Sequence, residues 1–333
     1  MTLPKLLLVM TIVLFGAIGL VYVMKGEKKE SDLKIVEAAP FEIELDKEVQ
    51  LLAEELPLPK TTKESQDFFS DEKVAERRTQ CQPEVDRINE LFNIVEPKLP
   101  IVETIVYHSR VDWQKGRPAW LSDYANYYKT SRHFIARSLN GKPDYLKQDV
   151  AEGDRFNVFR KDSNFTFHLV IDLSRCKLWM YYVPAETKEP VLLKTYQVGL
   201  GRIDDTKTSG LLTPLGTYTL GSKIAIYKPK MTGIYNGGQV EMINIFGTRW
   251  IPFDKEVRGC TAPAKGFGIH GLPCTLNEKG VLVEDLGSLG RYQSDGCIRL
   301  SSQDIEEIFA IVITRPVTIE LVKDYCDSQI QHK

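Results

Sequence analysis

One short segment of the sequence places a nucleophile in a tight turn. Residues 294–300 read Ser-Asp-Gly-Cys-Ile-Arg-Leu, so Cys297 directly follows a glycine. A free thiol has a pKa near ~8.5 and is mostly protonated at neutral pH, so a nucleophilic cysteine needs a base or a positive field. The base candidate is His270, in the string Gly-Ile-His-Gly at 268–271. These residue types together indicate acyl transfer through a thioester.

The residues on either side of Cys297 have candidate supporting roles. Arg299 would add positive potential and can bind a substrate carboxylate. The turn at Gly296 would leave backbone N–H groups free to face the carbonyl oxygen of an acyl intermediate, as in an oxyanion hole.

A β-rich segment has to position these residues. From Asn164 onward, apolar or alternating runs are separated by turn residues, and at least six strands in about 160 residues predict a sandwich or barrel. One helix is predicted directly after the cysteine turn, because Ser301 begins a capping box and the following apolar residues recur at helical spacing. The predicted strands are 165–173, 178–183, 191–198, 216–220, 223–227, 240–246 and 317–322, and the apolar helix positions are Ile305, Ile308, Phe309 and Val312.

Four ordered motifs resemble the YkuD-type L,D-transpeptidases. The catalytic region of that family reads I-H-G, a variable stretch, and then S-H-G-C-[IV]-R-[LM]. Residues 269–271 and 294–300 match it at every position except 295. Upstream, Val-Gly-Leu-Gly at 198–201 matches V-G-x-G, and Thr-Pro-Leu-Gly-Thr-Tyr at 213–218 matches T-P-x-G-x-[FY]. The resemblance predicts a catalytic domain over residues 164–323.

Two departures from the family pattern need an explanation. Asp295 stands where the motif has histidine, so it would orient a polar partner or repel a substrate carboxylate. The interval from His270 to Cys297 is 27 residues, longer than is typical of the family. This interval contains Leu276–Leu286 with a polar turn at 277–280, which predicts a lid or a surface hairpin over the site.

The resemblance implies a two-step transfer on peptidoglycan stem peptides. Cys297 attacks the carbonyl of the third stem residue, and the terminal D-alanine leaves with a proton from His270. A neighbouring stem amine then forms a cross-link, whereas water as acceptor would make the protein an L,D-carboxypeptidase. His270 would be held in its tautomer by a backbone carbonyl, with Gly271 and Ser294 nearby, while Arg299, Gly296 and Asp295 would contact substrate. No metal or organic cofactor is implied, and carbapenems are the inhibitor class.

A rival interpretation is a wall-binding protein without activity. Its best support is Asp295, because an altered motif is what an inactive domain would show.

A small α+β module is predicted over residues 105–160, in the order strand, helix, helix, strand. The pattern resembles a LysM module, with a glycine at 116, Asn140 after the second helix and Gly-Asp at 153–154. This resemblance implies binding to glycan strands, and the alternative is a spacer without a ligand.

The N-terminus is predicted to lie in the membrane. Residues 6–24 are nineteen residues without a charge, which is about the ~20 needed to cross a bilayer. No small-residue cleavage site follows at 22–25, which favours a signal anchor over 1–24 rather than a cleaved signal. We expect a single-pass inner-membrane protein of a bacterium, with its catalytic domain in the periplasm or cell-wall space.

The charge is divided unevenly along the chain. Residues 25–104 carry 12 basic and 20 acidic residues, which predicts a solvated tether, with one short helix from 85 to 95. The folded body after it is mildly basic, and the net charge of −2 argues against a nucleic-acid partner.

The other candidate side chains are assigned to structure. Cysteines without C-x-x-C spacing argue against zinc, and Cys260 with Cys274 is the first choice for a disulfide. The remaining histidines are expected to be structural or solvent-facing, and three aromatic residues are weighed as groove lining but favoured as core. They are His108, His133, His168 and His332, and Tyr227, Tyr235 and Trp250.

Overall fold

The computed structural model describes residues 83–145 and 147–332. The predicted membrane span and most of the predicted tether lie outside these residues. Within the described ranges, no helix combines the length and the apolar character that crossing a membrane requires.

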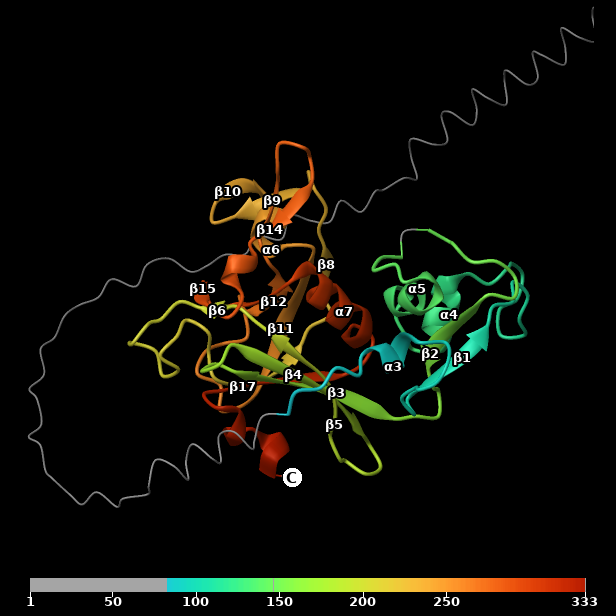
Figure 1. The fold of residues 1–333 in the computed structure, drawn as a ribbon, viewed down its shortest axis with the longest axis horizontal. Helices are drawn as coiled ribbons and strands as arrows, with labels where there is room; N and C mark the ends of the chain where they lie inside the picture. Colours follow the sequence, from blue (N-terminus) through green and yellow to red (C-terminus); the bar gives the residue numbers. More distant parts are fainter. Residues whose placement is uncertain (1–82, 146, 333) are drawn as a thin grey trace, which may run out of the picture. The chain divides into compact units, whose positions relative to one another are not determined.

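A nine-stranded sheet forms the C-terminal half of the chain (Figure 1). Its order is β16-β12-β11-β7-β17-β3-β4-β5, and β8 also pairs with β11. The pairs β12–β16 and β17–β3 are parallel and the other pairs are antiparallel. The sheet is a nearly closed sandwich or barrel, which confirms the predicted mainly-β class. The strands are β3 (Phe165–Asp172), β4 (Lys177–Pro184), β5 (Val191–Gln197), β7 (Gly216–Leu220), β8 (Ala225–Ile226), β11 (Arg249–Arg258), β12 (Gly268–Gly271), β16 (Ile298–Leu300) and β17 (Val317–Val322).

Helix α7 (Ser302–Val312) packs against the strands that carry the cysteine motif. Ser301 caps it, accepting a hydrogen bond from the N–H of Asp304 at 3.1 Å, as the sequence predicts. The apolar face is buried, and the helix contacts β11, β12 and β16. Because α7 starts one residue after β16, its burial fixes the end of the strand that follows Cys297.

The predicted strand, helix, helix, strand order is present in the upstream module. Strands β1 (Val102–Val106) and β2 (Arg155–Phe159) pair antiparallel, and helices α4 (Leu121–Tyr127) and α5 (Arg132–Asn140) lie between them in the chain. Helix α5 begins at the cap Ser131 and ends at Gly141, whose φ of 71° is left-handed. A separate apolar cluster fills the module, with Tyr107, Leu121, Tyr124, Ile135, Phe156 and Val158 among its members.

The module is attached to the sheet through α7 and β11. The Ser131 hydroxyl bonds to the carbonyl of Ala310 in α7, and the His133 ring lies edge-on to Phe309 at 5.5 Å. Arg249, 2% exposed, pairs with Asp144 of the module. Burial lowers the pKa of His133 to about 4, so this contact is made by a neutral imidazole.

The chain before the module is more extended than predicted. Only Asn89–Phe92 (α3) is helical, while Val85 and Asp86 lie along the edge of β5. The N–H of Arg87 donates to Leu193 and the N–H of Thr195 donates to Val85. The apolar residues between 85 and 95 recur at helical spacing, but that spacing runs through an extended stretch along β5 and then a single helical turn. This pairing covers a strand edge that would otherwise be open.

Two other local predictions are wrong. Residues 240–246 are not a strand: β10 (Gly238–Glu241) pairs with β9 (Thr232–Tyr235), and α6 (Ile243–Phe246) follows. Cys260 and Cys274 do not form a disulfide. Cys260 contacts the carbonyl of Thr217 beside β7, whereas Cys274 is buried against the carbonyl of Leu272, so the two thiols are directed at different strands.

The long interval before the cysteine is a surface hairpin, as expected. Strands β13 (Cys274–Leu276) and β14 (Leu282–Glu284) pair antiparallel, and Asn277 closes the turn by accepting from two backbone N–H groups. A 3-10 turn, η1 (Leu286–Ser288), then leads to β15 (Tyr292–Ser294), which pairs in parallel with β6 (Leu200–Gly201). The chain ends in the 3-10 turns η2 (Tyr325–Asp327) and η3 (Gln329–His332).

Candidate active site

The reactive residues lie on one face of three adjacent strands. Trp250 of β11 is opposite His270 of β12, and His270 is opposite Arg299 of β16. Directly paired residues point to the same side of a sheet, so these three share a face. Cys297 directly precedes β16 and lies two residues before Arg299. The opposite face is core, because Ile251, Ile269 and Ile298 are at most 1% exposed.

The backbone of Gly271 fixes the tautomer of His270. The Nδ1 atom lies 2.7 Å from the carbonyl oxygen of Gly271, which can only accept a hydrogen bond, so Nδ1 carries the proton. Nε2 is left with a lone pair. Burial, helped by the charge of Arg299, lowers the pKa of His270 to about 4, so the ring is neutral at physiological pH.

The Cys297 thiol is half-buried and protonated. Its Sγ lies 3.6 Å from the carbonyl oxygen of Gly266, to which it donates. Burial raises the thiol pKa to about 12, while the Gly268 N–H and Arg299 oppose that rise. The resting site therefore holds a neutral thiol and a neutral imidazole, not an ion pair.

A set of internal hydrogen bonds shapes the turn that carries Cys297. The Ser294 hydroxyl donates to the carbonyl of Cys297 at 2.7 Å and accepts from the N–H of Gly296 at 3.1 Å. Thr213 donates to the carbonyl of Gly296 and accepts from the N–H of Gly201. Gly296 has a φ of +120°, and a Cβ there would lie 2.6 Å from the Phe267 ring. The turn therefore requires glycine at this position.

These hydrogen bonds show which backbone N–H of the turn is available as the oxyanion donor. The N–H of Gly296 is occupied by Ser294, whereas the N–H of Cys297 has no hydrogen-bond partner among the described residues. Cys297 itself therefore offers the free backbone N–H next to the sulfur. Ser294 lies in this turn and does not contact the His270 ring in any hydrogen bond of the described chain.

Arg299 is a positive charge with no counterion in the described part of the chain. Within the described residues it makes no ion pair, and its buried Nε has no hydrogen-bond partner. Its backbone exchanges two hydrogen bonds with Gly199, at 2.8 and 2.9 Å, which hold it in place. A partly buried guanidinium with an unused donor is suited to receive a carboxylate.

Asp295 points away from the core and pairs with Arg202. The distance from Nη2 to Oδ1 is 2.6 Å. A polar partner for Asp295 is one of the two alternatives that the sequence predicts, but no motif drew attention to Arg202.

Aromatic rings enclose the imidazole on its other side. Phe246 lies edge-on to His270 at 5.3 Å, and Trp250 lies 5.9 Å away. Tyr227 stacks on Phe246. Phe246 was missed because its segment was expected to be a strand. It approaches through Gly247, whose φ is 60° and where a Cβ would lie 2.5 Å from the backbone of Gly271.

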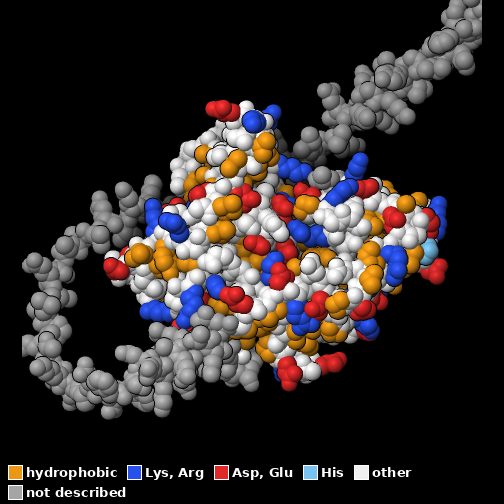
Figure 2. Space-filling model, viewed as in Figure 1, with side chains coloured by type: hydrophobic (Ala, Val, Ile, Leu, Met, Phe, Trp, Pro, Cys, Tyr) orange, Lys and Arg blue, Asp and Glu red, His pale blue; other side chains and the backbone are white. Residues whose placement is uncertain are grey.

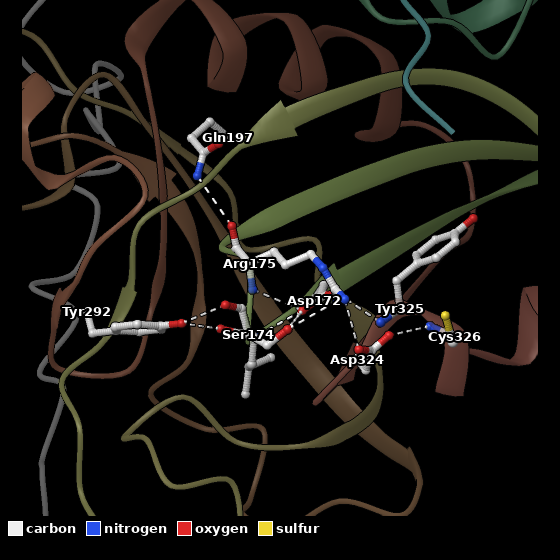
Figure 3. A network of polar contacts seen from close by, with 9 residues as sticks. Asp172, Ser174, Arg175, Gln197, Tyr292, Asp324, Tyr325 and Cys326 are labelled. Atoms are coloured by element: carbon white, nitrogen blue, oxygen red, sulfur yellow. Dashed lines mark hydrogen bonds and ion pairs between the residues drawn. The ribbon is translucent and has the colours of Figure 1, made fainter. Parts of the chain in front are cut away.

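The strand leading into the reactive turn is anchored by Tyr292 (Figure 3). Its hydroxyl donates to the carbonyls of Leu173 at 2.8 Å and Ser174 at 3.1 Å, in the turn between β3 and β4. That turn is stabilised by Asp172, fully buried, which accepts from Ser174 and pairs with Arg175. Tyr292 thereby ties the approach to Cys297 to a rigid part of the sheet.

The other histidines and cysteines are not brought to this site. His108, His133 and His168 lie beside Glu152, Asp144 and Glu320, respectively. In the part of the chain that the structure describes, no cluster of His, Cys, Asp or Glu could hold a metal ion. Cys81 and the side chain of His332 lie outside the described residues.

A β-sheet domain with a cysteine in a glycine turn and a tautomer-fixed histidine on the adjacent strand contains the groups that thiol-dependent acyl transfer requires. Residues 166–319 match the family model of the L,D-transpeptidase catalytic domain, YkuD. This segment is therefore a YkuD-type L,D-transpeptidase catalytic domain.

Solved structures with a similar chain path are remote in sequence. Bd1075 from Bdellovibrio bacteriovorus is 15% identical, with 48% of this chain and 49% of that chain covered and a TM-score of 0.33. The helical cell shape determining protein Pgp2 from Campylobacter jejuni is 17% identical, with 49% and 50% covered and a TM-score of 0.31. An L,D-transpeptidase from Mycobacterium smegmatis is 14% identical, with 52% and 76% covered and a TM-score of 0.27. The aligned part spans about half the length of the first two chains. No curated protein sequence matches this chain.

Proposed function

We propose that this protein is a peptidoglycan L,D-transpeptidase that works through a thioester on Cys297. The observation that carries the proposal is that Cys297 directly precedes β16, the strand that pairs with the His270 strand β12, while Nδ1 of His270 is bonded to Gly271. With the proton on Nδ1, the lone pair of Nε2 is available as a proton acceptor.

The first half-reaction forms the acyl-enzyme. As the sulfur of Cys297 attacks the donor carbonyl, its proton passes to Nε2 of His270. Because the resting pair is neutral, proton transfer accompanies the attack instead of preceding it. The N–H of Cys297 faces the developing oxyanion, and the departing amine takes the proton back from Nε2 as the peptide bond breaks.

The second half-reaction releases the acyl group. An incoming amine attacks the thioester carbonyl and gives its proton to His270, after which the C–S bond breaks and the thiol is regenerated. Water in place of the amine yields a trimmed stem, which is the carboxypeptidase outcome.

Arg299 is proposed to hold a donor carboxylate. Its unpaired guanidinium and its place beside His270 support this role. Gly296 shapes the turn, and Asp295 acts on substrate charge together with Arg202.

Purified chain incubated with disaccharide tetrapeptide separates the alternatives. We expect cross-linked dimers from the wild type and none from Cys297→Ala. Tripeptide without dimers would identify a carboxypeptidase instead. Equal product from both proteins would contradict the proposed nucleophile, and no product from a folded wild type would favour the non-catalytic alternative.

The upstream module is proposed to bind glycan strands. Its support is the LysM-like order of elements and an exposed Trp120, with the guanidinium of Arg117 4.9 Å from the ring centroid. Trp113 also stacks on Tyr127 at 4.4 Å. Co-sedimentation with purified sacculi should weaken in Trp120→Ala and remain unchanged in Val95→Ala, which removes another exposed apolar side chain. Equal sedimentation of both variants would count against the glycan site.

We further propose that residues 6–24 anchor the protein in the inner membrane with its catalytic domain outside. The uncharged run at 6–24 supports this placement. Fractionation of cells should recover the full-length chain with inner membranes, accessible to protease from the periplasmic side. Recovery as a shortened soluble chain would instead indicate a cleaved signal.

A further inference from the structure

The ion pair of Arg202 and Asp295 lies beside the reactive turn. Both side chains are more than half exposed, at 62% and 63%. Exposed pairs add little to folding stability, with typical values of about 0–1 kcal/mol. The pair can therefore matter more for the electrostatics near Cys297 than for folding stability.

The backbone sets the position of Arg202. Its N–H donates to the carbonyl of Ser294, the residue before Asp295, at 2.9 Å, and its own carbonyl accepts from Leu212 at 2.9 Å. Arg202 is thus bonded to the same turn that carries Cys297. These two backbone hydrogen bonds fix the point from which the guanidinium of Arg202 reaches Asp295.

The carboxylate of Asp295, whose charge Arg202 balances, acts on the Cys297 thiol. Among the described residues, the charged side chains that influence the Cys297 thiol are Arg299, which lowers its pKa, and Asp295, which raises it. Arg299 also acts on His270, the remaining titratable group on the shared face. An unbalanced Asp295 would disfavour the thiolate and repel an anionic donor.

We propose that Arg202 is a positioning residue that neutralises Asp295, and that the pair sets how readily Cys297 ionises and how well the turn accepts an anionic reactant. Asp295 stands where the family motif has histidine, and Arg202 balances its charge. The role toward acyl donors rests on the proposed function, whereas the role in ionisation does not.

Two alkylating agents of similar size test the proposal without any peptidoglycan substrate. Iodoacetamide is neutral and iodoacetate is anionic, so their rate ratio at Cys297 reports the local charge. The full chain is alkylated at fixed pH, and modification of Cys297 is measured by peptide mass spectrometry, so that other cysteines do not contribute. Near-ultraviolet circular dichroism confirms that each variant is folded.

Variants that change the net charge of the pair are expected to shift the ratio, whereas variants that keep it are not. Arg202→Gln leaves one negative charge, so the iodoacetate-to-iodoacetamide ratio falls about threefold and both rates drop. Asp295→Asn leaves one positive charge and raises the ratio. The double variant is neutral again and returns to the wild-type ratio, and Arg202→Lys, which keeps the charge, stays near it.

A matched control breaks an equally exposed ion pair elsewhere. Arg160 and Asp162 are 2.7 Å apart and 44% and 69% exposed, and Arg160→Gln should leave the ratio unchanged. A wild-type ratio in Arg202→Gln, or a double variant whose ratio stays far from the wild-type value, would overturn the proposal. If the ratio responds as expected but no acyl transfer occurs, the proposed function fails and the electrostatic role stands. If acyl transfer occurs but the ratio does not respond, the electrostatic role fails and the proposed function stands.

Discussion

Burial determines the proton distribution at the reactive residues. His270 is 3% exposed and its pKa falls to about 4, while the pKa of the Cys297 thiol rises to about 12. Both shifts favour the uncharged form, as expected for groups taken out of water. In the proposed reaction, the thiol therefore becomes a nucleophile only as its proton passes to Nε2 of His270.

This resting state predicts the pH dependence of thiol reactivity. With a pKa near 12, the thiolate fraction of Cys297 should rise about tenfold per pH unit, and alkylation by iodoacetamide should follow it from pH 6 to 9. The rate is read from the Cys297 peptide, with the half-exposed Cys260 as an internal comparison. A plateau beginning below pH 8 would reveal a preformed thiolate–imidazolium pair and contradict the neutral resting state.

The sequence singles out Cys297 and His270 as candidate reactive residues, but it does not reveal several of the side chains that the structure places around them. Cys297 and His270 stand in short motifs that occur in the order expected for the family. Gly271, whose carbonyl bonds to Nδ1 of His270, is the next residue in the chain. Arg202 and Thr213 act through contacts that span 93 and 83 positions in the chain. Spacing along one sequence does not reveal such contacts, because sheet pairing decides them.

At the scale of elements, two short parallel strand pairs hold the site. β12 pairs with β16, and β6 pairs with β15, so the reactive turn is held from both sides. Thr213 joins these pairs, because its fully buried hydroxyl bonds to Gly201 in β6 and to Gly296 in the turn. Loss of this hydroxyl would leave a buried donor and a buried acceptor without partners.

Thr213→Val tests this link because it keeps the shape of the side chain and removes both bonds. We expect a loss of about 2–6 kcal/mol in the free energy of unfolding, at about 1–3 kcal/mol for each of the two unsatisfied groups. Turnover should fall at least tenfold, because Gly296 positions the neighbouring Cys297. Chemical denaturation and the stem-peptide assay measure the two effects, and Thr213→Ser should retain most of both.

The control is Thr166→Val, at an exposed position of β3. It should change stability by less than about 0.5 kcal/mol. Wild-type stability and activity in Thr213→Val would show that the turn is held by other contacts.

Strand existence was easier to predict than strand limits or short elements. β3, β4, β5, β7 and β17 carry long apolar runs and were predicted within a few residues. The run at 240–246 has the composition of a strand, yet four of its residues form α6, where Ile243 and Phe246 are buried. The long β11 was not predicted, since its second half is exposed and charged and has no apolar alternation.

At the scale of the molecule, buried charged contacts join the upstream module to the catalytic domain. Arg249, fully enclosed, lies between Asp144 of the module and Glu306 of α7, and it is adjacent in β11 to Trp250 of the site. Truncating one partner of a buried charged pair is costly, because the other charge remains unpaired. On the face drawn in Figure 2, basic and acidic side chains are interspersed, so this face offers no surface of a single charge to an acidic polymer.

This docking predicts cooperative unfolding of the module and the catalytic domain. Differential scanning calorimetry of the full chain should show one transition for both parts, because α5 and α7 share buried contacts. Asp144→Ala should lower the transition temperature, or split off a module transition, by leaving Arg249 without its nearer partner. Lys142→Ala, which removes a surface pair with Asp149, should have little effect. Two well-separated transitions in the wild type would show that the two parts fold independently.

The most direct test of the central claim is the mass of the acyl-enzyme. Wild-type protein mixed briefly with a soluble tetrapeptide stem, then acid-quenched, should gain the mass of the peptide without its terminal residue, and the adduct should map to Cys297. Cys297→Ala should gain nothing under the same conditions. An adduct on another residue, or turnover of the stem by Cys297→Ala, would contradict the assignment of Cys297 as the nucleophile.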